Sequence, residues 1–272
     1  MKNGVDINSL KKLICFQLEN NINALIVCGT TGEASTLSTK EREIIIKTAV
    51  NMCRGLVPVI VGVGSNNTYQ VIKNCQIAKE LGADGFLIVT PYYNKCTQSG
   101  LVAHFTEIAN STSLPIILYN VPSRTGVNIL PDTCLTLSKL KNIVGIKEAS
   151  GNISQIAKIS ALCKENLPIY SGNDDQILPI FSLGGIGVIS VLSNIHPQET
   201  IDIVNNFLNG NTIEGINVQL SEMKLIELLF TEVNPIPVKE ALNILGFKCG
   251  IPRLPLTQCS DSLKSKLSEI LL

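Results

Sequence analysis

Charged side chains are scarce in this sequence, since only 16% of its 272 residues are Asp, Glu, Lys or Arg, against about 25% in average soluble proteins. The 22 basic and 22 acidic residues cancel, and the absence of a basic cluster argues against a nucleic-acid partner. No run reaches the roughly 18 apolar residues of a membrane span, so we expect no membrane association. Hydrophobic residues make up 45% of the chain, and so few charges predict that part of the surface is covered in an oligomer.

Several catalytic and targeting patterns are also missing. The nine cysteines include no C-x-x-C pair, and the N-terminus has no apolar run of the signal-peptide type. Both observations predict a reduced, cytoplasmic protein. The two histidines, His104 and His196, are too few for a histidine-rich metal site. The nucleophile elbow of α/β-hydrolases, the Walker A pattern and a complete dinucleotide-binding glycine pattern do not occur.

The chain does contain an alternation of short, apolar, β-branched runs with amphipathic helical segments. Such runs are typical of parallel strands that are covered on both faces. Seven strands are predicted, at Ala24–Gly29, Val57–Gly64, Gly85–Tyr93, Pro115–Pro122, Ile143–Ser150, Pro168–Asn173 and Gly187–Asn194.

Helices are predicted before, between and after these strands, and a capping box, Ser38-x-x-Glu41, marks the start of the second one. Strand–helix repeats of this number indicate a TIM (β/α)8 barrel in residues 1–210, followed by a C-terminal helical domain in residues 211–272. The first six residues cannot supply a strand, so we expect the first barrel strand to be missing. The predicted helices are Ser9–Glu19, Thr39–Cys53, Thr68–Leu81, Gly100–Thr112, Pro131–Leu140, Ile153–Cys163, Asp175–Leu183, Pro197–Leu208, Thr212–Leu229, Pro237–Leu245 and Ser260–Leu271.

Polar residues stand at the carboxyl ends of several predicted strands, where (β/α)8 barrels carry their active sites. Thr30 and Thr31 follow the first run, between two glycines, although hydroxyls in such a turn can also serve local hydrogen bonding. Tyr93 ends the third run, and Tyr119 lies near the end of the fourth. Strand-end tyrosines are often packing residues. Arg124, in the next loop, is either a surface charge or a ligand for a carboxylate, which suits its planar guanidinium.

Lys147 is the sharpest candidate because it lies inside the apolar fifth run. Period-two alternation places it on the same face as Gly145, whose small size would leave room for the amine. If that face points into a barrel, desolvation favours the neutral amine, which is the nucleophile that forms a Schiff base with a carbonyl substrate. The alternative is a lysine that extends from a strand end to water. Tyrosines and hydroxyls at the other strand ends favour the catalytic interpretation.

Taken together, these residues resemble the dihydrodipicolinate synthase family of pyruvate-dependent class I aldolases, to whose superfamily N-acetylneuraminate lyase also belongs. The likeness covers nearly the whole chain from about Val5 onward. The matching motifs are Gly29–Glu33, Val89–Asn94, Tyr119–Gly126, Gly145–Ala149, Ser171–Asp174, Gly187–Ser190 and Glu232–Lys239.

The resemblance implies a Schiff-base aldol condensation of pyruvate with L-aspartate 4-semialdehyde that gives 4-hydroxy-tetrahydrodipicolinate, the first committed step of diaminopimelate and lysine biosynthesis. The full motif Ser123–Gly126 favours this reaction over that of the alternative, an N-acetylneuraminate lyase, whose aldehyde substrate is a sugar. The resemblance further implies a homotetramer built as a dimer of dimers, with neither cofactor nor metal.

Roles for single residues also come from the resemblance. Lys147 would form the Schiff base, and Tyr119, Thr31 and Tyr93 would relay protons, with Tyr93 supplied by the neighbouring subunit. Arg124 would bind the carboxylate of the aldehyde substrate. The residues expected to hold pyruvate or to line the site are Thr30, Thr31, Gly172 and Ile189.

Asn66 and Tyr92 match a lysine-binding site that inhibits many family members. Lysine-sensitive members have a glutamate where this chain has Gln70, and histidines where it has Thr39 and Arg42. A neutral amide removes a carboxylate for the amine of lysine. We therefore predict weak or absent inhibition by lysine.

The start of the chain also differs from the family, in which a strand that ends in Thr-Pro precedes the loop matching Lys2–Val5. Two interpretations follow. The start is misassigned or truncated and the intact protein is an ordinary synthase, which the presence of every catalytic position favours. Alternatively, the short chain is itself a weakly active or non-enzymatic homologue.

Overall fold

The computed structural model describes residues 4–272, which form two compact units. One unit is Ile60–Ile189, and the other joins the described residues up to Val59 with Ser190–Leu272. Lys2 and Asn3, in the loop where the family resemblance begins, lie outside the described residues. Within the described chain, no helix is both long and apolar enough to cross a membrane.

The strands follow one another in the sheet in chain order, and from β2 to β7 each pairs with the next in parallel, as the strand–helix alternation predicted. All five residues of the central strand β4 are buried, which explains why these runs read as continuously apolar. The bounds are β1 (Leu25–Val27), β2 (Val59–Gly62), β3 (Gly85–Val89), β4 (Ile116–Asn120), β5 (Ile143–Glu148), β6 (Ile169–Ser171) and β7 (Gly187–Val188).

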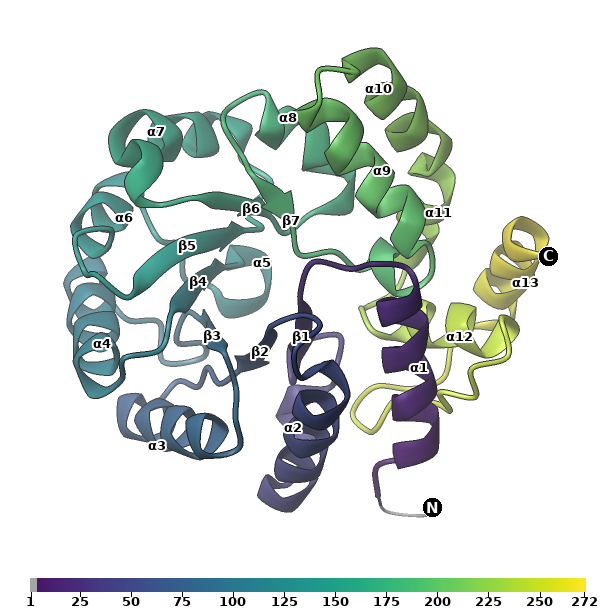
Figure 1. The fold of residues 1–272 in the computed structure, drawn as a ribbon, viewed down its shortest axis with the longest axis horizontal. Helices are drawn as coiled ribbons and strands as arrows, with labels where there is room; N and C mark the ends of the chain where they lie inside the picture. The colour runs from purple at the N-terminus through teal and green to yellow at the C-terminus, as the bar shows by residue number, and fades with distance from the viewer. Residues whose placement is uncertain (1–3) are drawn as a thin grey trace. The chain divides into compact units, whose positions relative to one another are not determined.

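In the unit Ile60–Ile189, the longer helices cover the outer side of the strands (Figure 1). The side chain of Thr97 caps the first turn of α4, so this helix begins two residues before the predicted Gly100. The bounds are α3 (Thr68–Glu80), α4 (Gln98–Ser111), α5 (Pro122–Thr125), α6 (Pro131–Leu137), α7 (Ile153–Cys163) and α8 (Ile177–Phe181), with 3₁₀ turns η2 (Lys164–Asn166) and η3 (Asp174–Gln176).

The other unit is mainly helical. The predicted capping box at Ser38 and Glu41 is confirmed, and the amide of Leu25 in β1 donates to the carbonyl of Pro58 at 3.0 Å. The bounds are α1 (Ile7–Glu19), α2 (Thr39–Cys53), α9 (Pro197–Leu208), α10 (Thr212–Ser221), α11 (Met223–Leu229), α12 (Ile236–Ile244) and α13 (Asp261–Leu271), with 3₁₀ turns η1 (Ala34–Thr36) and η4 (Leu192–Asn194).

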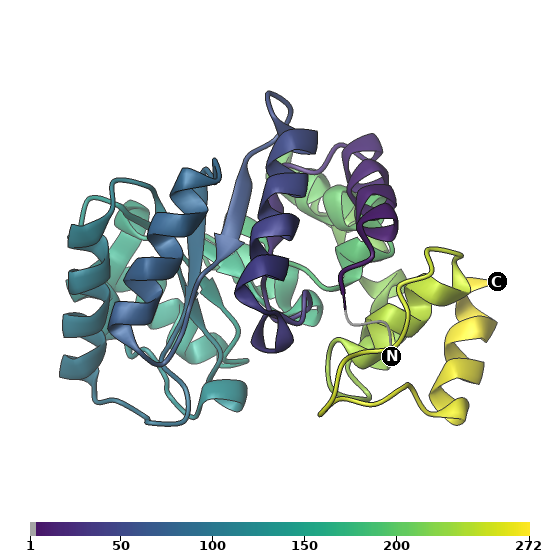
Figure 2. The ribbon, with the colours of Figure 1, turned by 90° about the horizontal axis from the view of Figure 1, so that it is seen from below.

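The helices at the end of the chain share an apolar core. Leu225, Leu229, Val238, Leu263 and Leu267 are all buried in one cluster. Helices α12 and α13 lie side by side, as the yellow ribbon of Figure 2 shows. An ion pair between Lys264 and Glu240, 2.6 Å long, adds to this packing.

Besides shifts of element ends, three elements differ from the prediction. The segment 212–229 is two helices, because Glu222 ends α10 and its carboxylate turns to the imidazole Nδ1 of His196, 2.8 Å away. The last strand ends at Val188, because the chain then turns into η4, where Ser190 accepts a hydrogen bond from the amide of Ser193. The one-turn helix α5, which begins at Pro122, was not predicted.

Candidate functional site

Lys147 and Tyr119 lie on neighbouring strands and are register partners in the β4–β5 pair. The Nζ atom of Lys147 is 4.5 Å from the centroid of the Tyr119 ring, which is the geometry of a cation–π contact. Tyr119 is buried and Lys147 is half-buried. The structure therefore brings the predicted nucleophile and a predicted proton-transfer residue together.

Gly172, and not Gly145, makes room for the lysine side chain. A Cβ atom on Gly172 would lie 3.1 Å from Cε of Lys147 and 2.6 Å from Cβ of Ala149. A Cβ on Gly145 would instead meet the Tyr170 ring at 3.1 Å. The prediction for Gly145 was wrong because the ring of the register partner of Lys147 on β6, Tyr170, fills that space.

Backbone hydrogen bonds place Gly172 and Ile189 just beyond the ends of β6 and β7. The amide of Gly172 donates to the carbonyl of Glu148 at 2.8 Å, and the amide of Ile189 donates to that of Ser171 at 2.8 Å. Both residues thus lie at the carboxyl end of the sheet, as Lys147 does. This is the end at which parallel α/β folds carry their active sites.

A buried carboxylate, which the sequence reasoning missed, follows the lysine in sequence, on the opposite face of β5. Glu148 is fully buried and accepts hydrogen bonds from the side-chain amide of Asn120 at 3.0 Å and the backbone amide of Ser150 at 2.8 Å. Burial raises the pKa of Glu148, against the effect of these hydrogen bonds. Its position directly after Lys147 in an apolar strand was the available signal.

The side-chain amide of Asn120 also fixes the segment that follows Arg124. The side-chain oxygen of Asn120 accepts from the backbone amide of Ile129 at 3.0 Å, and its nitrogen donates to Asn128 at 2.8 Å. The amide of Asn128 in turn donates to Gln155 of α7 at 2.7 Å. Buried polar groups that satisfy one another in this way hold a loop in a single conformation.

Arg124 lies in the one-turn helix α5 with its side chain exposed. The helix is anchored by Thr125, whose buried hydroxyl donates to the carbonyl of Val121 at 3.1 Å. Gly126 ends it with φ +69°, and a Cβ there would lie 2.7 Å from Cε of Lys95. The arginine is therefore held at the mouth of β4 while its guanidinium extends outward.

The loop after β3 presents Tyr92 and Tyr93 outward. Tyr93 is 89% exposed and has φ +74°, a left-handed backbone that bulky residues adopt only under strain and that often marks a functional position. The side chain of Asn94 donates to the carbonyl of Asn66 at 3.0 Å. The predicted lysine-site residues Asn66 and Tyr92 thus belong to neighbouring segments.

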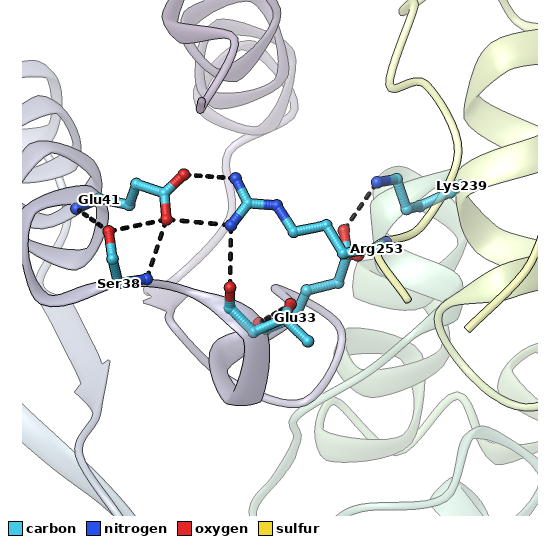
Figure 3. Close-up of polar contacts among 6 residues, drawn as sticks. Glu33, Ser38, Glu41, Lys239 and Arg253 are labelled. Carbon is cyan, nitrogen blue, oxygen red and sulfur yellow. Dashed lines mark hydrogen bonds and ion pairs between the residues drawn. The ribbon is translucent and has the colours of Figure 1, made fainter. Parts of the chain in front are cut away.

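Thr30 and Thr31 lie in the other unit, in the turn after β1. The hydroxyl oxygen of Thr31 accepts a hydrogen bond from the side-chain amide of Asn234 at 3.0 Å. The carboxylate of Glu33 in the same turn binds Nζ of Lys239 at 2.7 Å and the backbone amide of Arg253 at 2.8 Å (Figure 3). These partners are about 200 positions away in sequence, so sequence reasoning did not find them.

The histidines and cysteines are not among the predicted site residues. Burial lowers the pKa of His104 to about 4, and its Nδ1 is 2.9 Å from the hydroxyl of Thr68. All nine cysteines are free, and burial raises the pKa of Cys75 to about 12. Across residues 4–272, no group of three or more His, Cys, Asp or Glu side chains could hold a metal ion.

Comparison with known proteins gives concordant results. The model of the dihydrodipicolinate synthetase family matches residues 1–272. The chain is 55% identical over 265 residues to 4-hydroxy-tetrahydrodipicolinate synthase of Alkaliphilus oremlandii, a match that covers 97% of this chain and 91% of that protein.

Solved structures agree with the sequence comparison. Dihydrodipicolinate synthase of Thermotoga maritima superimposes with a TM-score of 0.96 at 44% identity, over 100% of this chain and 94% of that one. The enzyme of Cyanidioschyzon merolae, solved with lysine bound, gives a TM-score of 0.95 at 40% identity, over 98% of this chain and 93% of that one.

Proposed function

Because this chain belongs to the dihydrodipicolinate synthetase family, we propose that it condenses pyruvate with L-aspartate 4-semialdehyde to give 4-hydroxy-tetrahydrodipicolinate. The enzyme is a lyase of the Schiff-base aldolase type, at the first committed step of diaminopimelate and lysine biosynthesis. The observation that carries the proposal is the amine of Lys147 against the ring of Tyr119, at the carboxyl end of a parallel sheet.

The chemistry starts at Lys147. Its neutral amine attacks the carbonyl carbon of pyruvate, and loss of water gives an imine. The imine withdraws electrons, so a methyl proton leaves and an enamine forms. The enamine carbon attacks the aldehyde carbon of the semialdehyde, and the aldehyde oxygen takes up a proton. The amino group of the product then displaces Lys147 from the imine carbon, which closes the ring and frees the enzyme.

The remaining residues bind substrate or move protons. Tyr119, Thr31 and Tyr93 form the proton relay, and the outward-pointing, strained Tyr93 is supplied to a neighbouring subunit. Arg124 binds the carboxylate of the semialdehyde with its guanidinium. The residues that hold pyruvate or line the site are Thr30, Thr31, Gly172 and Ile189, the last two through their carbonyls.

The finer architecture belongs to the same proposal. We assign a (β/α)8-type barrel domain to residues 1–210 and a C-terminal helical domain to residues 211–272. The protein works in the cytoplasm, which its nine free thiols support, as a homotetramer of two dimers. Sedimentation equilibrium should give four times the chain mass of 29.4 kDa, and a monomer at assay concentration would contradict the tetramer.

Lysine should inhibit weakly or not at all. Gln70 is exposed, and its side-chain amide donates to Asn74 at 2.9 Å, so it offers no carboxylate to the amine of lysine near Asn66 and Tyr92. The Gln70→Glu variant should gain sensitivity. Titration of the initial rate with lysine tests this, and inhibition of the unmodified enzyme below millimolar lysine would contradict it.

The substrate is tested by a coupled assay. Purified protein is given pyruvate with L-aspartate 4-semialdehyde, and in parallel pyruvate with N-acetylmannosamine. The proposal expects turnover of the first pair only. Turnover of the sugar alone would identify a lyase of the N-acetylneuraminate type, and no turnover of either would support a weakly active or non-enzymatic homologue.

A further inference from the structure

The turn that carries Thr30 and Thr31 is held by a segment near the other end of the chain. Asn234 donates from its side-chain amide to the hydroxyl of Thr31 at 3.0 Å, and it is buried. Glu33, two residues beyond Thr31, is bound at one carboxylate oxygen by Lys239 and at the other by the backbone amide of Arg253. Figure 3 shows Glu33 between these two partners.

We propose that Asn234 is a positioning residue for the Thr31 hydroxyl, and that the Glu33–Lys239 ion pair fixes the turn on which this hydroxyl is carried. The proposal rests on the proposed function, in which Thr31 relays protons. Asn234 contacts the Thr31 hydroxyl and Lys239 contacts Glu33. Both residues therefore act through the turn that carries Thr31.

The direction of the hydrogen bond at Thr31 supports a positioning role for Asn234. A hydroxyl has one proton and two lone pairs. Because the amide nitrogen of Asn234 can only donate, it occupies one lone pair and leaves the proton and the second lone pair of Thr31. Those are the two functions that a relay needs, since the group must accept a proton from one side and give one to the other.

The surroundings of Glu33 support the claim that its ion pair with Lys239 fixes the turn. Its side chain and that of Lys239 are 15% and 16% exposed, so their ion pair is largely shielded from water. Glu33 itself has a left-handed backbone with φ +53°, a conformation that costs free energy in a non-glycine residue. Both carboxylate oxygens are bound, so the strained turn is held from two points at once.

Arg253 adds further contacts between residues 234–253 and the segment that leads from this turn to α2; we call these contacts together the clamp. Its guanidinium donates to the carbonyl of Thr36 at 2.9 Å and forms an ion pair with Glu41. The stretch from Thr31 to Glu41 is therefore tied to residues 234–253 at both of its ends. A displacement of about 1 Å in a reacting group can lower a rate about 100-fold, which makes this anchoring relevant to turnover.

The relay step is tested with Asn234→Ala and Asn234→Asp. Aspartate accepts and does not donate, so it draws the Thr31 proton to itself. We expect both variants to lower kcat about 10- to 100-fold, with a smaller change in KM and with thermal unfolding that stays above the assay temperature. In a Thr31→Val background, Asn234→Ala should cause little further loss. Losses that multiply independently would overturn the proposal.

The turn step is tested without reference to activity. Lys239→Met removes the cation at Glu33, and Lys264→Met removes the cation of the more exposed Glu240 ion pair as a control. Hydrogen–deuterium exchange of peptides covering residues 29–36 should accelerate in Lys239→Met and recover in Lys239→Arg, with no change in Lys264→Met. Unchanged exchange in Lys239→Met would overturn the proposal even if the enzyme proved inactive on the proposed substrates, whereas faster exchange in an inactive protein would refute only the proposed function.

Discussion

A glycine, Gly172, leaves the space that the side chain of Lys147 occupies. Gly172 lies just beyond the end of β6, beside Lys147, and any Cβ there would overlap Ala149 and crowd the Cε of the lysine. The neighbouring backbone carbonyl of Glu148 would lie 3.0 Å from it and cannot move without breaking the strand pair.

We expect Gly172→Ala to lower the free energy of unfolding by about 1–3 kcal/mol, as overpacked interiors do, and to lower kcat by displacing Lys147. Gly4→Ala, where a Cβ would have open space, serves as the control. Urea unfolding and steady-state rates measure both effects. Unchanged stability together with unchanged kcat in the Gly172→Ala variant would contradict the packing argument.

Glu148 makes the folding stability of the protein depend on pH. Burial raises its pKa above the ordinary value of 4.5, so the folded protein binds this proton more tightly than the unfolded chain does. Stability from this group is therefore greatest below pH 4.5 and falls as the pH rises through the raised pKa.

The Glu148→Gln variant cannot ionise and should lose that slope. Its stability relative to the unmodified protein should improve steadily as the pH rises from about 4 toward neutrality. At any one pH, the variant also carries a fixed cost of about 1–3 kcal/mol, because its amide group faces donors from Asn120 and Ser150. Urea unfolding at several pH values measures the difference, and a difference independent of pH would count against the buried carboxylate.

At the scale of elements, α2 shows how local and distant contacts combine. Its start follows from the capping box of Ser38 and Glu41, which is local and was predicted. The same Glu41 carboxylate also binds Arg253, 212 residues away. The hydrogen bond from Arg253 is the main reason that the pKa of Glu41 falls to about 2.

We expect Glu41→Gln to remove an acid-sensitive part of the stability. Because the folded pKa of Glu41 is depressed, its contribution is present above pH 4.5 and is lost as the pH falls toward 2. The guanidinium is about a third exposed, so water screens the pair and the effect should be about 1 kcal/mol. Thermal unfolding of both proteins at pH 3 and pH 6 tests this prediction. An equal loss of stability in Glu41→Gln at the two pH values would contradict it.

Elements with local signals could be predicted from sequence, and elements set by distant contacts could not. The strands were found because their apolar runs are continuous, although the pattern extends β7 past Val188 into a turn. The break between α10 and α11 depends on His196, 26 residues before Glu222. In the site, Lys147 and Tyr119 follow from the strand-end rule. The clamp on Thr31 joins residues 203 apart, which no local pattern reveals.

For the molecule as a whole, family membership and the parallel α/β sheet agree with one mechanism. The comparisons favour a 4-hydroxy-tetrahydrodipicolinate synthase over an N-acetylneuraminate lyase. The carboxyl ends of β4, β5 and β6 place Tyr119, Lys147 and Gly172 beside one another. The other proposed roles depend on the proposed covalent step at Lys147.

The central claim, that Lys147 forms a Schiff base with pyruvate, is tested most directly by reduction with borohydride in the presence of pyruvate, followed by intact-mass and peptide mass spectrometry. Borohydride converts the imine to a stable secondary amine, so the adduct survives analysis. We expect one reduced pyruvate adduct per chain, on the peptide that contains Lys147, and none in Lys147→Arg. An unlabelled chain, or a label on another lysine, would contradict it.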